Sequence, residues 1–489
     1  MKMLIYGIDG GDLEIMKTFD MPFVHQFLEE NENVDLTVDL YNRGWVEILT
    51  GKEGKHTRGF YKSPVLDGSH RCATKFSMKE LEGDPEIVPL WKLAEQKGHK
   101  YCIMNVPTTT PVPKTTNGIV IGSAGGGLNK IEGIPEILVS DEKTRKYLED
   151  QGYIVDIRIP NEDIEETEEL FRQLKKMEDV RTDCFVDICK EEEVEFGFLA
   201  NRGTTIAEYL ARSEIESYAA LKEMSEFMPA GGEKSWVHEH LEEHFLALDN
   251  NIRKLYEELK PDHLIITADH NMVPHKYRAN IDCFLRENGW LVEKSSSSLL
   301  KTVKRVAHKF VPGKSIGKMT SKLPPTMRDS LKTYDWGKSV AFGSTFVSGI
   351  FINDNDRFSG PVKKSKEIDR WIDLICAEFN TQDDAKKMGI IAYAYRKQHE
   401  GAKFSRNLPD ICFSGAEGVF FDAGCPELFQ KNKHYGPIPK KVENIVTNPF
   451  TGDKGMNPIC LMTGSTSSLV EPNDKLDLTL VYKLVDRVL

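Results

Sequence analysis

Short apolar runs alternate with longer amphipathic stretches along most of this sequence, and no other feature constrains its fold as strongly. Residues 3–8 predict a strand, residues 12–30 a helix and residues 34–40 a second strand. Further strands are predicted at residues 101–105, 118–122, 194–200 and 263–267. This alternation indicates an α/β fold with a doubly wound, mostly parallel sheet and helices on both faces. In such sheets, functional groups gather at the carboxyl ends of the strands.

The length of the chain is compatible with one large core and an inserted smaller unit. With 489 residues and 40% hydrophobic content, the chain can bury such a core without disulfides. We expect the core to span residues 1–489. Two segments predict an inserted cap, the highly charged residues 130–195 and the basic residues 295–332.

Charge and cysteine usage exclude several classes of protein. A net charge of −12 disfavours binding to a nucleic-acid duplex, although a bound metal would still allow a small anionic substrate. No stretch is long and uncharged enough to span a membrane, and the first apolar run is too short for a signal peptide. The nine cysteines are scattered and form no Cys-x-x-Cys pair, which predicts free thiols and a cytoplasmic location.

Carboxylate and imidazole groups follow two of the predicted strands. Asp9 comes directly after the first strand and precedes two glycines, and the pair Asp269-His270 follows the strand at residues 263–267. Mixed oxygen and nitrogen ligands of this kind suit a divalent ion such as zinc or manganese. Each motif alone is weak, because an Asp-Gly-Gly is usually a turn and an Asp-His pair often closes a loop. Together they predict one metal site.

Several longer segments occur in a fixed order along the chain. They are Gly7-Ile8-Asp9-Gly10, Trp45-Val46-Glu47-Ile48-Leu49-Thr50-Gly51, Lys55-His56, Asn105-Val106-Pro107-Thr108-Thr109, Ala268-Asp269-His270-Asn271 and Leu408-Pro409-Asp410-Ile411. In these segments the chain resembles the alkaline phosphatase superfamily, specifically its branch of type I phosphodiesterases, nucleotide pyrophosphatases and related phosphohydrolases. The resemblance covers nearly the whole chain and implies an alkaline phosphatase-like fold.

Members of that superfamily hold two metals around a serine or threonine nucleophile, and this chain departs from the pattern. Tyr41 stands in the nucleophile position. Asn201 and Thr205 replace the Asp and His of one metal site, and Lys454 falls on or near its last His. That site has lost three expected ligands. The other site retains Asp9, Asp269 and His270, so the resemblance implies a single divalent ion, zinc or manganese.

These residues lead to a functional hypothesis and an alternative. The hypothesis is a metal-dependent phosphoryl- or nucleotidyl-transfer enzyme that hydrolyses a phosphodiester or phosphomonoester of a small metabolite or nucleotide. Its catalytic residues are Tyr41, as nucleophile or as a group covering the metal, and Lys454. Its substrate-binding residues are Asn42, Arg43, Asn201, Arg202 and Thr205. The alternative is an inactive or regulatory binding protein, or a transferase acting on another tetrahedral group.

A second histidine motif offers a competing metal site. His240-Leu241-Glu242-Glu243-His244 matches the H-x-x-E-H pattern of inverted zinc peptidases. The segment lies in a charged helical stretch with no peptidase context around it. We therefore interpret it as the solvated face of a helix.

Overall fold

A seven-stranded sheet forms the centre of the larger of two lobes. The computed structural model describes residues 1–124, 133–157, 167–227, 234–294, 334–344, 349–422, 425–438, 440 and 450–489. The strand order is β2-β18-β8-β1-β7-β5-β6. The strands are β1 (Met3–Ile8), β2 (Glu32–Asn33), β5 (Tyr101–Met104), β6 (Gly118–Ile121), β7 (Phe196–Asn201), β8 (His263–Thr267) and β18 (Cys460–Met462). The five from β8 to β6 are parallel, and β18 runs antiparallel to both of its neighbours.

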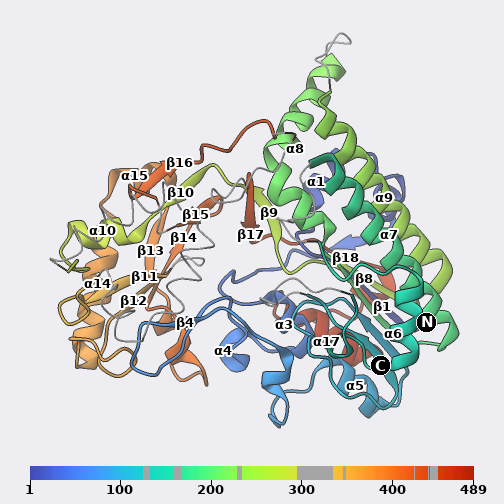
Figure 1. Ribbon diagram of the computed structural model, residues 1–489, viewed down its shortest axis with the longest axis horizontal. Coiled ribbons are helices and arrows are strands. Elements are labelled where there is room, and N and C mark those ends of the chain that lie inside the picture. The colour runs from blue at the N-terminus through green and yellow to red at the C-terminus, as the bar shows by residue number, and fades with distance from the viewer. Residues whose placement is uncertain are drawn as a thin grey trace.

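Helices cover both faces of this sheet, as the alternating sequence pattern predicted. Long helices lie against one face: α7 (Thr167–Glu191), α8 (Gly203–Phe227) and α9 (Trp236–Leu259), with the shorter α1 (Leu13–Thr18), α2 (Pro22–Glu30) and α6 (Glu142–Asp150) nearby (Figure 1). The other face carries α3 (Gly44–Thr50), α5 (Leu90–Lys97) and α17 (Thr479–Val488). The parallel strands of the central sheet are therefore largely apolar on both sides, which explains their continuous hydrophobic runs.

The smaller lobe contains two further sheets (left in Figure 1). One has the order β11-β12-β14-β13 and consists of Ala341–Ser344, Gly349–Ile352, Ile411–Ser414 and Ile391–Ala394. The other has the order β15-β10-β16 and consists of Val419–Phe421, Tyr277–Ala279 and Phe429–Lys431. Helices α10 (Ile281–Glu287), α14 (Ser365–Phe379) and α15 (Asp383–Met388) complete this lobe. Its core is a separate cluster of apolar side chains.

Short elements connect the two lobes. The ribbon of β9 (Asn271–Pro274) and β17 (Gly452–Gly455) lies between them. Other short elements of the described residues include α4 (Gly54–Thr57), β3 (Ser63–Pro64), β4 (Cys72–Ala73) and α16 (Gly464–Ser467).

Two local predictions of secondary structure were wrong. The helix expected at residues 12–30 is broken into α1 and α2, because Pro22 lacks a backbone N–H and starts a new helix. Residues 34–40 form no strand beyond an isolated bridge at Thr37. Residues 167–191, expected within a cap, form α7, whose apolar side chains pack against the central sheet and α9. The other expected cap segment, residues 295–332, lies outside the described residues.

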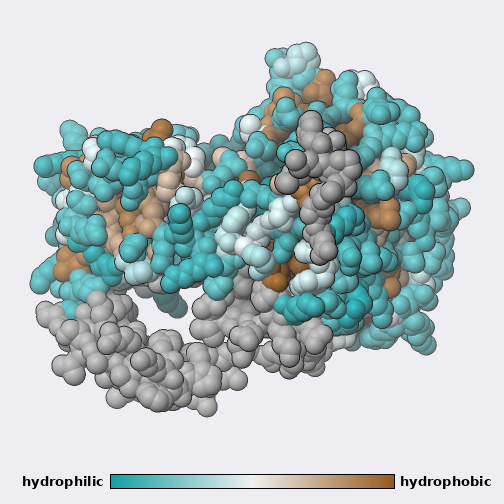
Figure 2. Space-filling model, turned by 90° about the horizontal axis from the view of Figure 1, so that it is seen from above, coloured by the Kyte–Doolittle hydropathy of each residue, from teal (hydrophilic) through white to brown (hydrophobic). Residues whose placement is uncertain are grey.

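The surface seen from above is largely hydrophilic, with hydrophobic residues in scattered groups (Figure 2). Among the described residues, no helix combines the length and apolar character that a membrane-spanning segment requires.

Candidate functional site

Polar side chains from neighbouring strands meet where the carboxyl ends of β8, β1 and β7 lie side by side. Asp9 follows β1, Arg202 follows β7, and Asp269 and His270 follow β8. Because these three parallel strands are adjacent, the residues that follow them share one edge of the sheet. They line a cleft of about 230 Å³ together with Arg43, Trp45, Tyr61, Pro107, Thr108, Thr205, Tyr209 and Lys454.

Asp9, Asp269 and His270 are arranged to hold a cation. All three side chains are buried, and one ligand atom from each lies within 4.8 Å of the others. His270 Nε2 lies 3.5 Å from Asp9 Oδ1 and 3.7 Å from Asp269 Oδ1. Ligand atoms around one tetrahedral zinc ion are about 3.3 Å apart, given zinc–ligand bonds of about 2.0–2.1 Å. The three groups therefore fit a single divalent ion.

Unsatisfied polar atoms support this fit. Asp269 Oδ1 and His270 Nε2 are buried and form no hydrogen bond with any residue in the described part of the chain. The other atoms of the same side chains are occupied: His270 Nδ1 lies 2.9 Å from the Asn271 carbonyl, and Asp269 Oδ2 accepts from the Tyr61 hydroxyl at 3.2 Å. Trp45 Nε1 donates to Asp9 Oδ2 at 3.3 Å. Such outer contacts turn the remaining ligand atoms toward one point.

Glycines allow the surrounding segments to approach this point. Gly44 begins α3, and a Cβ atom there would lie 2.7 Å from the Cβ of Asp269. Gly10 has a φ of 82°, in the left-handed region, and a Cβ atom there would lie 3.0 Å from Thr205. Side chains at either position would displace the groups around Asp9 and Asp269.

Three cationic side chains border the carboxylates. Arg43 Nε and Nη2 donate to the carbonyls of Phe60 and Thr74 at 2.9 and 2.8 Å, which hold the guanidinium in place. Arg202 pairs with Asp156 at 2.6 Å, and its Nε lies 3.5 Å from Asp9 Oδ2. The Lys454 ammonium contacts the Tyr61 hydroxyl. The cleft can therefore attract an anion beside a bound metal.

Burial and neighbouring charges shift the pKa values of these groups. Burial raises the pKa of Asp269, and the nearby charge of Asp9 adds to this shift, while His270 and Lys454 oppose it. Burial also acts on Asp9, but His270, Arg202 and Lys454 hold its pKa well below the usual value. Burial lowers the pKa of Lys454, although the negative charges of Asp269 and Asp9 act to raise it. A divalent ion would favour the charged form of both carboxylates.

The structure does not place Tyr41, the predicted nucleophile, in the cleft. Its hydroxyl donates to the Lys62 carbonyl at 2.6 Å, and its ring packs against Phe60 and Tyr395 in a cluster that joins the two lobes. Tyr41 does not line the cleft. The apolar ring is buried between the lobes, and Arg43, two residues later, faces the cleft instead.

We expect Tyr41→Phe to leave metal content and any turnover unchanged. The variant loses one hydrogen bond to Lys62, so unfolding in urea should show a loss of about 1 kcal/mol of stability. Loss of turnover at normal metal content and normal stability would contradict this assignment.

Two other residues predicted to bind substrate, Asn42 and Asn201, have side chains that bond within the protein core. Asn42 Nδ2 donates to Glu47 Oε1 at 2.8 Å. The side chain of Asn201 bonds to the Tyr6 hydroxyl at 3.2 Å and accepts from Arg181 at 3.4 Å. Neither residue lines the cleft, whereas Thr205 does. The reason is burial: each amide has polar partners in the core that it would leave unpaired by turning outward.

The cleft is also lined by Tyr61, Thr108 and Tyr209, which were not predicted from the sequence as site residues. Thr108 lies within one of the motif segments, but nothing in the sequence showed that it lines the cleft. Tyr61 and Tyr209 lie outside all of the motifs. Their positions follow from the packing of α8 and of the segment after α4.

A buried carboxyl, Glu178, lies behind the site against the start of α8. A Cβ atom on Gly203 would lie 2.2 Å from Glu178 Oε1, so the carboxyl packs directly against the backbone of Gly203. Burial raises the pKa of Glu178 to about 8, although Arg181 opposes the shift. The unfolded chain releases this proton near the ordinary pKa of about 4.3. Folding stability therefore falls as pH rises between these two values, because the folded state holds the proton longer.

Glu178→Gln is expected to remove this pH dependence. The amide is neutral at every pH, so the Tm of the variant relative to wild type should rise between about pH 5 and about pH 8. Thermal unfolding across this range measures the difference. A constant difference in Tm would show that Glu178 titrates in the same way in both states.

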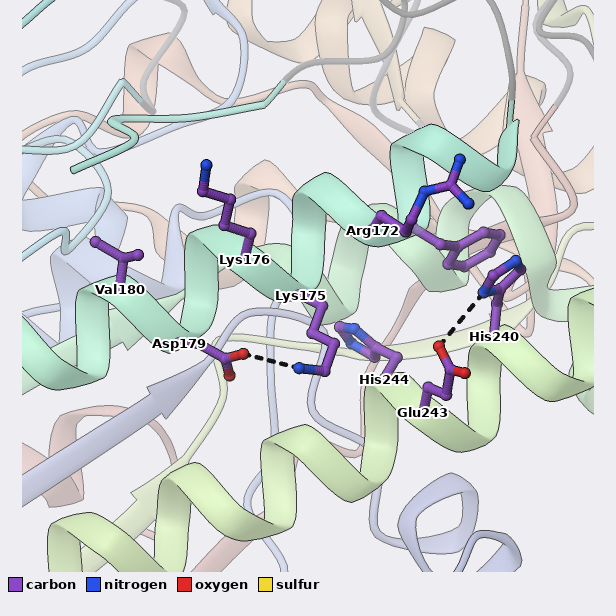
Figure 3. A pocket seen from close by; sticks show the side chains of 9 residues that line it. Arg172, Lys175, Lys176, Asp179, Val180, His240, Glu243 and His244 are labelled. Atoms are coloured by element: carbon purple, nitrogen blue, oxygen red, sulfur yellow. Dashed lines mark hydrogen bonds and ion pairs between the residues drawn. The ribbon is translucent and has the colours of Figure 1, made fainter. Parts of the chain in front are cut away.

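The histidine motif of α9 forms no metal site with its neighbours in the described residues. A pocket of about 220 Å³ lies between α7 and α9 (Figure 3). There His240 pairs with Glu243 at 3.6 Å and stacks on Phe171. His244 is fully buried and faces the Thr204 hydroxyl at 3.4 Å. The two imidazoles have different neighbours, and the predicted solvated helix face is wrong for His244, because α9 packs this side chain against the core.

The fold matches solved structures, whereas sequence comparison identified no relative. No protein-family model and no curated protein matches the chain. It is similar to phosphonoacetate hydrolase from Sinorhizobium meliloti 1021 in complex with phosphonoacetate, with a TM-score of 0.53, 9% identity, and coverage of 100% of this chain and 95% of that one. It is also similar to an inactive murine ectonucleotide pyrophosphatase/phosphodiesterase 5 in complex with AMP, with a TM-score of 0.48, 13% identity, and coverage of 100% and 94%. The predicted alkaline phosphatase-like fold is confirmed.

Proposed function

We propose that this chain is a metal-dependent phosphoester hydrolase acting on a small anionic substrate. One observation carries the proposal: the unsatisfied ligand atoms of Asp269 and His270 face Asp9 in the same cleft as three cationic side chains. A cation site beside a cluster of positive charge suits a substrate whose reacting group is an oxyanion.

Asp9, Asp269 and His270 would hold the ion, for which zinc and manganese are the candidates. When bound, such an ion polarises a phosphoryl oxygen and lowers the pKa of a nucleophile. Arg43 and Arg202 would bind oxygens of the substrate as charge builds on them. Lys454, at the position of a ligand that the family pattern expects, would stabilise negative charge on the leaving group.

The proposed substrates share one chemical class. Both phosphomonoesters and phosphodiesters are candidates. Phosphonates join them, because the similar hydrolase of the same fold was solved with phosphonoacetate. All nine cysteines are free, which supports the proposed cytoplasmic location.

The proposal is tested by metal analysis combined with a substrate screen. Protein dialysed against zinc or manganese should retain about one ion per chain. It should also hydrolyse at least one generic phosphomonoester, phosphodiester or phosphonate, and a chelator should remove the activity. Full metal uptake without turnover of any substrate would favour the alternative, a binding protein on the same fold. Failure to take up either metal would overturn the proposal.

A further inference from the structure

The loop after β5 contains a threonine with an unusual backbone. Thr108 has a φ of 77°, in the left-handed region that β-branched residues rarely adopt. Asn105, at the start of the same loop, has a φ of 59°. Residues held in such conformations persist only where the surrounding structure fixes them, and they concentrate at functional sites. The loop therefore bears strain at Thr108 that a glycine would relieve.

The rest of the loop explains how this conformation is held. The Met78 N–H donates to the Thr108 carbonyl at 2.9 Å. The hydroxyl of Thr109 donates to the Val106 carbonyl at 2.7 Å, and that of Thr110 donates to the Ser123 carbonyl at 2.6 Å. The hydroxyls of the two following threonines thus stabilise the loop itself.

Thr108 differs from both of them. Only 2% of its surface is exposed, and it lines the cleft that contains Asp9, Arg202 and Lys454. Its Oγ1 forms no hydrogen bond with any residue that the structure describes. A buried hydroxyl without a partner is unfavourable, and valine would fill the same space without that penalty. Strain and an unsatisfied hydroxyl thus coincide at one residue of the cleft wall, where a ligand would supply the missing partner.

We propose that Thr108 is a substrate-binding residue whose hydroxyl donates a hydrogen bond to an oxygen of the bound tetrahedral anion. This inference rests on the proposed function. The cations of the cleft supply charge, whereas the hydroxyl supplies a fixed, neutral donor, and the strained loop keeps it aimed at the anion.

Inorganic phosphate is the probe that tests this assignment, with binding measured by calorimetry on the full chain loaded with the ion that it takes up. Thr108→Val should weaken phosphate binding by roughly tenfold or more, because a hydrogen bond to a charged group is lost. Thr108→Ser should retain most of the affinity. Metal content should be the same in all three proteins, and the Tm of Thr108→Val without phosphate should equal or exceed that of wild type.

Thr109→Val is the matched control from the same loop. Its hydroxyl has a partner inside the protein, so this variant should have a lower Tm. If Thr108→Val lowers the Tm in the same way, or leaves phosphate binding unchanged, Thr108 is a structural residue and the inference is overturned. Wild-type protein that takes up metal but binds no phosphate would overturn the proposed function as well.

Discussion

Asp269→Asn is expected to remove metal binding and with it all metal-dependent turnover. Asparagine keeps the shape of the side chain but loses the charge of a ligand that also faces His270 Nε2 at 3.7 Å. The affinity should fall by more than the roughly 10- to 100-fold that loss of an outer-shell partner costs, because a direct ligand is lost. Elemental analysis after dialysis against buffered metal measures this effect.

A stability measurement provides a second test of the same substitution. At a metal concentration 100 times the Kd, binding to the folded state alone adds about 2.7 kcal/mol to the free energy of unfolding. Wild type should therefore gain Tm on addition of metal, and Asp269→Asn should not. Asp453→Asn is the matched control, since Asp453 lies beside Lys454 and outside the ligand set. An Asp269→Asn chain with full metal content would refute the site.

Asp410→Ala is expected to have the largest effect on stability. Asp410 is fully buried and binds Arg357 at 2.5 Å, Arg396 at 2.6 Å and the Ile352 N–H at 2.7 Å. Removal of its carboxylate leaves the buried Arg357 with one remaining carboxylate, that of Asp354. Breaking a buried ion pair in this way costs about 3–5 kcal/mol. Urea unfolding should show this loss.

A surface pair provides the control for Asp410. Lys397 and Asp369 lie 3.2 Å apart, with 40% and 49% of their side chains exposed. Asp369→Ala should change the free energy of unfolding by only about 0–1 kcal/mol, because water screens the pair. Equal effects of the two substitutions would show that the Asp410 network contributes no more than an exposed pair. The network also gives a structural reason for the Leu408-Pro409-Asp410-Ile411 motif, which lies far from the cleft in sequence.

The parallel strands of the central sheet were predictable because they are largely buried on both faces. A strand that is covered on both faces is apolar whichever strands lie beside it. Residues 263–267 were therefore recognised as a strand without knowledge of the fold. The segment at residues 34–40 was misassigned as a strand. Its alternating side chains pack against the C-terminal part of the chain, where the Thr37 N–H donates to the Leu476 carbonyl. Likewise, charge alone could not separate α7, a core helix, from a cap.

For the proposed metal site, the sequence indicated Asp9, Asp269 and His270 because they follow predicted strands, and the structure places these strands side by side. Only the tertiary structure decided which side chains complete the cleft. Tyr41 packs into the contact between the lobes, while Tyr61 donates to Asp269 and Thr108 lines the cleft. The direction of a loop side chain depends on which distant segments pack against it and satisfy its polar atoms. In a strand, in contrast, successive side chains point to opposite faces of the sheet, so their directions follow from the local sequence.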